Sequence, residues 1–230
     1  MKPKKIKENI FWVGAVDWDR RLFDSLIQLP DGTSYNSYLV YGKDKTALFD
    51  TVDPSKTDVL MSNLSDVPID SHKEWVSDKV SNTVIIPYVS MHNSTQLMVD
   101  YLTESLVKKG ITVERFNLPV TDIGKLAISL VDAATMVVGS PTVLAGAHLL
   151  VVSAVFLANA LRPKLKFASI IGSYGWAGKM TEQIKGLMSN LSVEVLEGVV
   201  IKGMPKDRDY NALERLANDI LNKHRRINIG

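Results

Sequence analysis

The second part of this sequence, from Thr83 onward, alternates short apolar segments with longer segments of helical spacing, and this alternation constrains the fold most. Several of the short segments are continuous apolar runs, as expected of strands that helices cover on both faces. Such alternation implies right-handed crossovers and a parallel sheet between two helical layers. We therefore predict an α/β fold, a three-layer α/β/α domain with a five-stranded parallel sheet. Strands are predicted at residues 84–88, 112–116, 135–139, 167–172 and 193–201, and helices at 95–109, 122–133, 147–160, 178–190 and 207–223.

The first part of the chain is β-rich instead. Apolar and aromatic runs at 10–13, 37–41 and 46–50 are separated by turn residues, and Gly42-Lys43-Asp44 predicts a hairpin between the last two runs. A short helix is predicted next, with Pro54 near its start. The polar stretch after it, which holds a lone Trp75, is interpreted as a linker. The predicted domains are a β-rich N-terminal segment (1–66), a linker (67–82) and the α/β domain (83–230).

Composition limits the chemistry available to the chain. The absence of cysteine among 230 residues excludes disulfides, thiolate metal sites, iron–sulfur clusters and cysteine nucleophiles. The four histidines, His72, His92, His148 and His224, show no metal-ligand spacing with carboxylates, so neither a metal site nor a catalytic residue is predicted. We expect His72 and His224 to be solvated. Redox chemistry would therefore need a bound organic cofactor.

The same data argue against nucleic-acid and membrane partners. A net charge of +2 is too small to indicate nucleic-acid binding. No secretory signal is evident at the start, and we expect a cytoplasmic protein. The apolar run 143–161 is interrupted by Gly146, His148 and Ser153, so it is interpreted as a core helix on the sheet and not as a membrane span.

Ligands of open parallel sheets bind beyond the carboxyl ends of the strands, where three unusual loops are expected. The first runs from Tyr88 directly into a helix. Its hydroxyl and amide groups lie where free N–H groups and the positive end of the helix dipole favour a phosphate. The alternative is an ordinary Ser/Asn helix cap. The phosphate candidates are Ser90, Met91, His92, Asn93, Ser94 and Thr95.

The second and third loops follow the third and fourth predicted strands. In the second, proline fixes the entry and glycine permits close approach of the backbone. In the third, two aromatic residues flank a glycine and suit stacking on a flat heterocycle. Each loop alone is more often a structural turn, but together with the first they indicate flavin mononucleotide (FMN). The ring candidates are Pro141, Thr142, Val143, Leu144 and Gly146 on one side, and Ser173, Tyr174, Gly175 and Trp176 on the other.

These three loop motifs resemble the flavodoxin-like domain of the flavodiiron proteins (A-type flavoproteins). The opening segments, around residues 13–21, 32–40 and 48–51, resemble the first strands of the metallo-β-lactamase-like domain of that family. Where the family has Asn-rich residues before the glycine of the second loop, this chain has Leu144-Ala145. The family's His-x-Glu-x-Asp-His motif and its further iron ligands do not follow Asp66. The resemblance implies that the flavin-binding domain is retained and that most of the metal-binding domain is missing.

We therefore expect an FMN-binding electron-transfer flavoprotein with a redox-protein donor and acceptor, and with a homo-oligomer or a metal-domain partner as options for assembly. A second hypothesis is a flavin-donor subunit that a separate metal-binding domain completes in trans. A third is an internal-deletion form without function. An NAD(P)H-dependent quinone reductase on the same fold has no supporting nicotinamide motif.

Overall fold

The computed structural model describes residues 2–23, 27–42, 46–67, 78–176 and 178–229. The chain divides into two compact units, Met1–Ser77 and Asp78–Gly230. We describe each unit by itself. The predicted linker residue Trp75, His72 and the turn residues Lys43-Asp44 lie outside the described residues. Within the described residues, no helix is long and apolar enough to cross a membrane.

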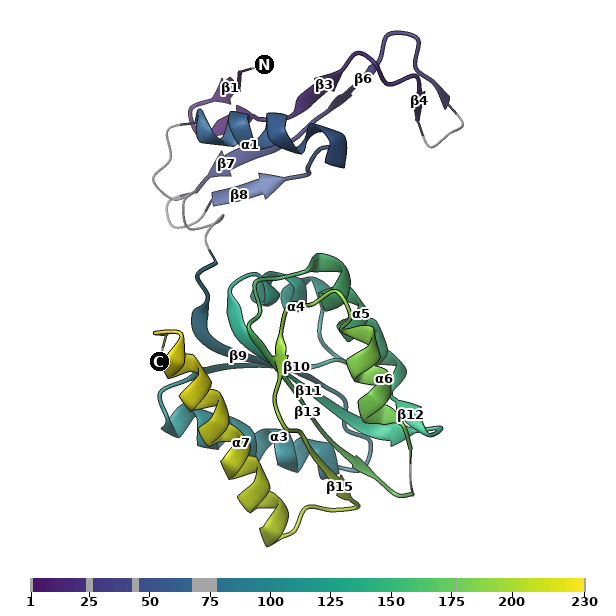
Figure 1. Cartoon of the computed structure of the whole chain (residues 1–230), viewed down its shortest axis with the longest axis vertical. Coiled ribbons are helices and arrows are strands. Elements are labelled where there is room, and N and C mark those ends of the chain that lie inside the picture. Colours follow the sequence, from purple (N-terminus) through teal and green to yellow (C-terminus); the bar gives the residue numbers. More distant parts are fainter. Residues whose placement is uncertain (1, 24–26, 43–45, 68–77, 177, 230) are drawn as a thin grey trace. The chain divides into compact units, whose positions relative to one another are not determined.

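The larger unit has the predicted three-layer α/β/α architecture (Figure 1). Its central strands run parallel in the order β10-β9-β11-β13-β14, and β15 also pairs with β13. The pieces β14 and β15 together occupy the fifth strand position, because β14 pairs with the start of β13 and β15 with its end. The strands are β9 (Ser81–Tyr88), β10 (Thr112–Asn117), β11 (Ala133–Val143), β13 (Phe167–Tyr174), β14 (Glu194–Val195) and β15 (Val199–Lys202).

Helices cover both faces of this sheet because their apolar stripes pack on it. On one face, α3 (Ser94–Lys108) and α7 (Asp207–Arg226) share a buried cluster with the strands. On the other face, α4 (Ile123–Leu130), α5 (Leu149–Leu161) and α6 (Met180–Leu187) share a second cluster. The strands between these two clusters are buried on both sides, which explains their continuous apolar runs.

Several element boundaries differ from the prediction. The predicted strand 193–201 is broken into β14 and β15 at Gly198, where an added Cβ would lie 2.3 Å from the carbonyl oxygen of Ile170. Strand β9 begins at Ser81, inside the stretch interpreted as linker. Helix α4 ends at Leu130, and residue 133 already belongs to β11. The hydrophobic pattern located each element, but close backbone contacts set where it ends.

The expectation that His224 is solvated is wrong. His224 lies near the end of α7 and is completely buried. Its Nε2 is 2.7 Å from Oγ1 of Thr135 on β11, and its Nδ1 is 2.7 Å from Oδ1 of Asn82 on β9. The reason is helical periodicity, because His224 continues the buried stripe of α7 formed by Leu213, Leu216, Ala217 and Ile220.

The smaller unit is built on a four-stranded antiparallel sheet in the order β1-β2-β7-β8. The hairpin predicted between the last two runs is formed by β7 and β8. One face of the sheet packs against α1 (Thr57–Ser65), where Val13, Leu39 and Leu60 are buried together. Two ribbons, β3–β6 and β4–β5, complete the unit. Its strands are β1 (Lys4–Lys7), β2 (Ile10–Trp12), β3 (Ala15–Asp17), β4 (Leu22–Phe23), β5 (Ile27–Gln28), β6 (Thr33–Tyr35), β7 (Tyr38–Tyr41) and β8 (Thr46–Phe49).

Candidate functional site

The three predicted loops begin at one edge of the larger sheet, on strands that are direct neighbours. In the pairing of β9 with β11, Tyr88 lies opposite Gly139. In the pairing of β11 with β13, Pro141 lies opposite Ser173. Because these strands are parallel, all three loops leave from their carboxyl ends. The fold therefore brings the starts of the predicted loops together, as expected of a ligand site at this edge.

The first loop leads from β9 into α3 through a left-handed residue, Asn93, with φ 64°. The first backbone hydrogen bond of the helix is Leu97 N–H to the Asn93 carbonyl, at 3.0 Å. The N–H groups of Ser94 and Thr95 come before this bond and have no acceptor within the helix. Ser90 Oγ accepts from the Gln96 N–H at 3.1 Å, so Ser90 acts as a cap, which was the alternative interpretation for this loop.

Two hydroxyl groups at the start of α3 have opposite environments. Ser94 Oγ donates to the carbonyl oxygen of Gly203 at 2.6 Å, and this hydrogen bond ties the helix start to the loop after β15. Thr95 is 1% exposed, and its Oγ1 is buried with no hydrogen-bond partner among the described residues. A buried hydroxyl without a partner is costly. An anion at the helix start would give both this hydroxyl and the free N–H groups an acceptor.

The second candidate segment is a hairpin and not an open loop. Strand β11 continues to Val143 and turns back into β12 (Gly146–Ala147), with Thr142 opposite Ala147 and Val143 opposite Gly146. The tip is formed by Leu144 and Ala145, whose φ angles are 49° and 64°. Leu144 is 100% exposed, whereas Pro141 is buried and Thr142 and Val143 are half-buried.

The glycine of this hairpin, Gly146, allows the hairpin to pack closely against helix α6. A Cβ added to Gly146 would lie 2.5 Å from Oε1 of Gln183 on α6, and that oxygen accepts from the Ala147 N–H at 2.8 Å. The close approach predicted for Gly146 is thus an approach to α6. The main-chain N–H of Lys179 donates to the Ala145 carbonyl at 2.7 Å, which holds the third loop against the hairpin.

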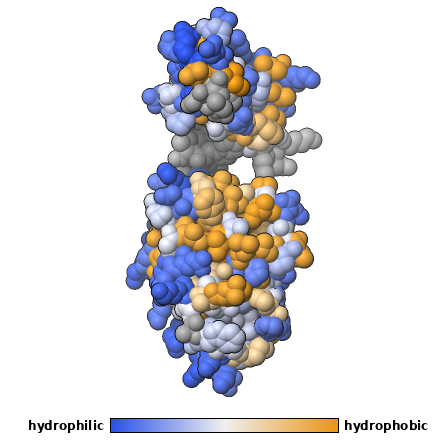
Figure 2. Space-filling model, turned by 90° about the vertical axis from the view of Figure 1, so that its right-hand side faces the viewer, coloured by the Kyte–Doolittle hydropathy of each residue, from blue (hydrophilic) through white to orange (hydrophobic). Residues whose placement is uncertain are grey.

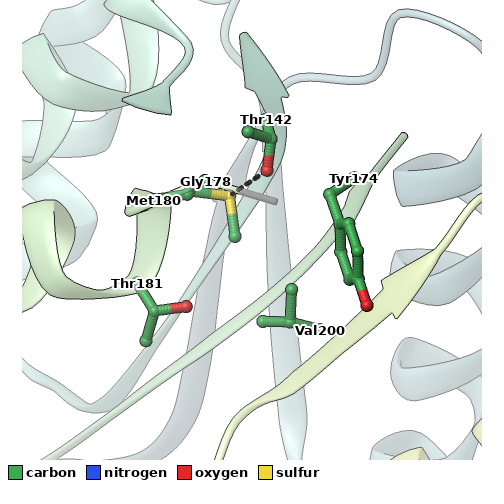
Figure 3. Close-up of a pocket in the computed structure, with 6 residues that line it drawn as sticks. All are labelled: Thr142, Tyr174, Gly178, Met180, Thr181 and Val200. Atoms are coloured by element: carbon green, nitrogen blue, oxygen red, sulfur yellow. Dashed lines mark hydrogen bonds between the residues drawn. The ribbon is translucent and has the colours of Figure 1, made fainter. Parts of the chain in front are cut away.

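The third segment continues β13 through Ser173 and half-buried Tyr174 and then leaves the sheet. Gly175 and Trp176 are exposed, and the side chain of Trp176 is 82% exposed. A small pocket of about 210 Å³ lies between this segment, the hairpin and α6 (Figure 3). The pocket is lined by Thr142, Tyr174, Gly178, Met180, Thr181 and Val200.

Sequence reasoning missed some residues at this edge of the sheet. Gly203 lies in the loop between β15 and α7 and accepts the hydrogen bond from Ser94, and the next residue, Met204, is half-exposed. Met180 and Val200 line the pocket but were assigned no role. The rule that pointed to the other loops, a turn directly after a parallel strand, also applies to residues 203–206.

The electrostatics of the edge favour an anion. Residues 88–99, 139–149 and 172–181, which contain the three segments, include no aspartate or glutamate. Lys179 is exposed directly after the third segment, and the start of α3 contributes a positive dipole end. Chemically, the arrangement can hold a phosphate group at one end and a flat ring beside the hairpin and the aromatic residues.

Relatives of known sequence match about two thirds of the chain. An uncharacterized protein of Methanocaldococcus jannaschii is 31% identical over 156 residues, 65% of this chain and 40% of that protein. The rubredoxin-oxygen oxidoreductase of Megalodesulfovibrio gigas is 29% identical over 153 residues, 66% of this chain and 38% of that protein. The nitric oxide reductase of Moorella thermoacetica is 28% identical over 156 residues, 66% of this chain and 39% of that protein. The chain thus spans about two fifths of each of these relatives.

Solved structures agree on the fold, although no protein-family model matches the chain. Rubredoxin oxygen:oxidoreductase from Desulfovibrio gigas has a TM-score of 0.63 at 18% identity, and the match covers 96% of this chain and 98% of that chain. A flavodoxin from the domain Archaea has a TM-score of 0.54 at 24% identity and covers 61% of this chain and 97% of that chain. Together with the sequence relatives, these likenesses make the chain a relative of the flavodiiron proteins that has a flavodoxin-like α/β unit.

Proposed function

We propose that this chain binds FMN at the carboxyl-terminal edge of its larger sheet and carries electrons between redox proteins. The relationship to flavodiiron and flavodoxin-like proteins supports a flavoprotein with electron-transfer chemistry. The observation that carries the proposal is Thr95, whose buried Oγ1 has no partner within the described residues and which lies at the free start of α3.

The phosphate would lie at the start of α3. The N–H groups of Ser94 and Thr95 have no acceptor within the helix, and the hydroxyl of Thr95 has no partner among the described residues, so these three groups are the available donors there. Ser90 and Ser94 already have hydrogen-bond partners, so we assign them to holding the loop and the helix start in place. His92 and Met91 are exposed and would lie at the rim.

The flat ring would lie between the β11–β12 hairpin and the aromatic segment. Leu144 at the hairpin tip and Trp176 are both strongly exposed, so each has a free apolar surface for a ring. When bound, FMN would supply one- and two-electron transfer, while the chain would bind and orient it. Among the described residues, no three His, Asp or Glu side chains converge to hold a metal ion, so the proposal assigns no step to iron.

The proposal is tested by the visible spectrum and metal content of the purified chain, and by comparing FMN with riboflavin, which lacks the phosphate. Thr95→Val should weaken FMN binding by about tenfold or more, because a hydrogen bond to a charged group is lost, and should leave riboflavin binding unchanged. The matched control is Thr103→Val on the same helix, whose hydroxyl bonds the Val99 carbonyl at 2.7 Å. A chain that remains colourless after incubation with FMN would contradict the proposal.

A second candidate, a flavin-donor subunit completed in trans by a metal-binding domain, is favoured by the smaller unit. Strand β8 is an edge strand that pairs only with β7 among the described strands, and it carries no charge and no proline. Three buried polar atoms of this unit lack partners within the described residues, namely the hydroxyls of Tyr35 and Tyr41 and Oδ1 of Asn63. Burial also raises the pKa of Tyr41. Co-purification of a stable iron-containing complex would support this candidate.

A further inference from the structure

Helix α5 of the larger unit is uncharged and mostly apolar around its whole circumference. Its thirteen residues contain no ionisable side chain. Val151, Val155 and their neighbours on the inner stripe are buried against the sheet, as the sequence predicts. The outer stripe is apolar apart from Ser153, yet Leu149 is 74% exposed and Phe156 is 63% exposed. A helix that is hydrophobic on all sides is normally buried on all sides. Within the described part of the larger unit, the outer face of α5 therefore lacks the cover that its sequence requires.

The exposed face continues from α5 onto the neighbouring helix α4. An apolar groove of about 430 Å³ runs between the end of α4 and the end of α5, lined chiefly by Ile128, Val131 and Leu161. All three of these side chains are themselves exposed. Figure 2, which views the side of the unit that carries these helices, shows hydrophobic residues gathered there. A protruding aromatic side chain, Phe156, and an apolar groove therefore lie on one face.

We propose that this α4–α5 face binds a second copy of the chain in a two-fold symmetric contact. In such a contact the same surface is used twice, so Phe156 of each copy would enter the groove of the other. Symmetry also brings charges near the two-fold axis close to their own copies, which is unfavourable. A helix without any ionisable residue avoids that repulsion, and a charge-depleted centre with phenylalanine is typical of interface cores.

The charges around the α4–α5 face favour a second copy of the chain over an acidic protein or an anionic lipid surface. Arg162 and Lys164 line the groove, and Lys164 lies 3.7 Å from Asp132. Helix α4 itself carries one basic residue, Lys125, and an acidic N-cap, Asp122. An acidic partner or an anionic lipid surface would be matched by an excess of basic residues. A nearly balanced rim around an uncharged centre is instead complementary to itself.

The first test is the oligomeric state of the full chain, measured by sedimentation velocity over a range of concentrations. We expect a dimer that Phe156→Glu dissociates, with a dimer dissociation constant raised by about a hundredfold or more. The matched control is Val107→Glu on α3, a similarly exposed apolar side chain (56%) on the opposite helical layer. Far-UV circular dichroism and FMN binding by both variants verify that the larger unit is folded and that the cofactor site is unaffected.

The second test uses the absence of cysteine in the chain. Ser153 lies on the exposed outer face of α5, between Leu149 and Phe156 along the helix. Ser153→Cys should form a disulfide-linked dimer under mild oxidation much faster than Val107→Cys, because only the former would face its own copy.

Three results would overturn the proposal. They are a chain that is monomeric at all concentrations, a dimer that Phe156→Glu leaves intact, and equal cross-linking of the two cysteine variants. A monomer that associates through this face only with lipid vesicles or with a different protein would also count against a second copy. Failure of FMN binding alone would not overturn the proposed dimer, because the dimer contact uses none of the proposed cofactor residues.

Discussion

At the scale of single residues, the hairpin tip at Leu144 and Ala145 stores backbone strain. Both residues have positive φ angles, as a type I′ turn requires, and such turns normally contain Asn or Gly. A left-handed conformation costs an L-residue roughly 1–2 kcal/mol. Strain of this kind persists where surrounding structure holds it, often at functional sites. Here the hairpin is held by Gln183 and by the Lys179 N–H.

Replacing the second residue of this turn should relieve the strain. We expect Ala145→Gly to raise the free energy of unfolding by about 1 kcal/mol, because glycine adopts positive φ without a steric penalty. Ala212→Gly in helix α7, which has ordinary helical geometry, should lower it by about 1 kcal/mol. Urea unfolding of both variants measures the two changes. A decrease in stability for Ala145→Gly would refute the strain argument.

The buried histidine makes stability depend on pH. The Asn82 amide donates to the Gly110 carbonyl, which leaves its Oδ1 to accept from Nδ1 of His224, so Nε2 accepts from Thr135. This neutral ring is fully hydrogen-bonded, and burial lowers its pKa from 6.5 to about 4. The stabilisation of the folded chain by neutral His224 is therefore complete above the pKa that this histidine has in the unfolded chain. It is lost as the pH falls towards the lower pKa that the histidine has in the folded chain.

We expect the free energy of unfolding to fall by about 2 kcal/mol between pH 7.5 and pH 5 through this histidine. His224→Asn should be less stable at pH 7.5 but should lose much less between the two pH values. His92→Asn, at an exposed position of the first loop, should show the same pH dependence of the free energy of unfolding as the unaltered chain. An unchanged pH dependence in His224→Asn would show that other groups dominate.

At the scale of elements, the break between β14 and β15 depends on a close backbone approach. A Cβ at Gly198 would lie 2.3 Å from the Ile170 carbonyl oxygen, whereas a Cβ at Gly186 in α6 meets nothing within 4 Å. Gly198→Ala should therefore destabilise the chain by about 2 kcal/mol or more, and Gly186→Ala should stabilise it by up to about 1 kcal/mol. Thermal unfolding of the two variants should show shifts of opposite sign. Equal shifts would mean that the contact at Ile170 relaxes without cost.

Periodicity and apolar runs predicted the five parallel strand positions and the helices between them, because these elements are defined by burial on a repeating face. The same reasoning did not find the β11–β12 hairpin, since Leu144-Ala145 carries no turn signal. The same reasoning also predicted that His224 is solvated, because His224 lies at the basic end of a helix. The buried stripe through Leu213 and Ile220 would have placed it in the core. The candidate loops were selected by a topological rule, but the lack of a partner for Thr95 Oγ1 among the described residues depends on tertiary packing and could not be predicted.

At the scale of the whole molecule, the two units have very different cores. The larger unit has a buried cluster on each face of its sheet, whereas in the smaller unit four residues form the fully buried cluster that the structure describes, Val13, Leu39, Leu60 and Val67. Small units with little buried apolar surface are marginally stable.

We expect a fragment of residues 78–230 to unfold in one cooperative transition and to bind FMN as tightly as the full chain. A fragment of residues 1–77 should show no cooperative transition by itself. Circular dichroism against urea, together with flavin titration, checks both expectations. A 78–230 fragment that fails to fold would mean that the smaller unit contributes to the stability of the larger one.

The contact between His224 and Asn82 also affects how the chain matures during synthesis. These residues are 142 positions apart and join the first strand of the larger unit to its last helix. The residues at the start of β9 are synthesised first, and their buried partner is synthesised 142 residues later. The larger unit therefore cannot close its core until α7 has left the ribosome, and until then the nascent chain exposes the start of strand β9. Such a chain depends on slow, long-range closure of its core, the stage at which chaperones act.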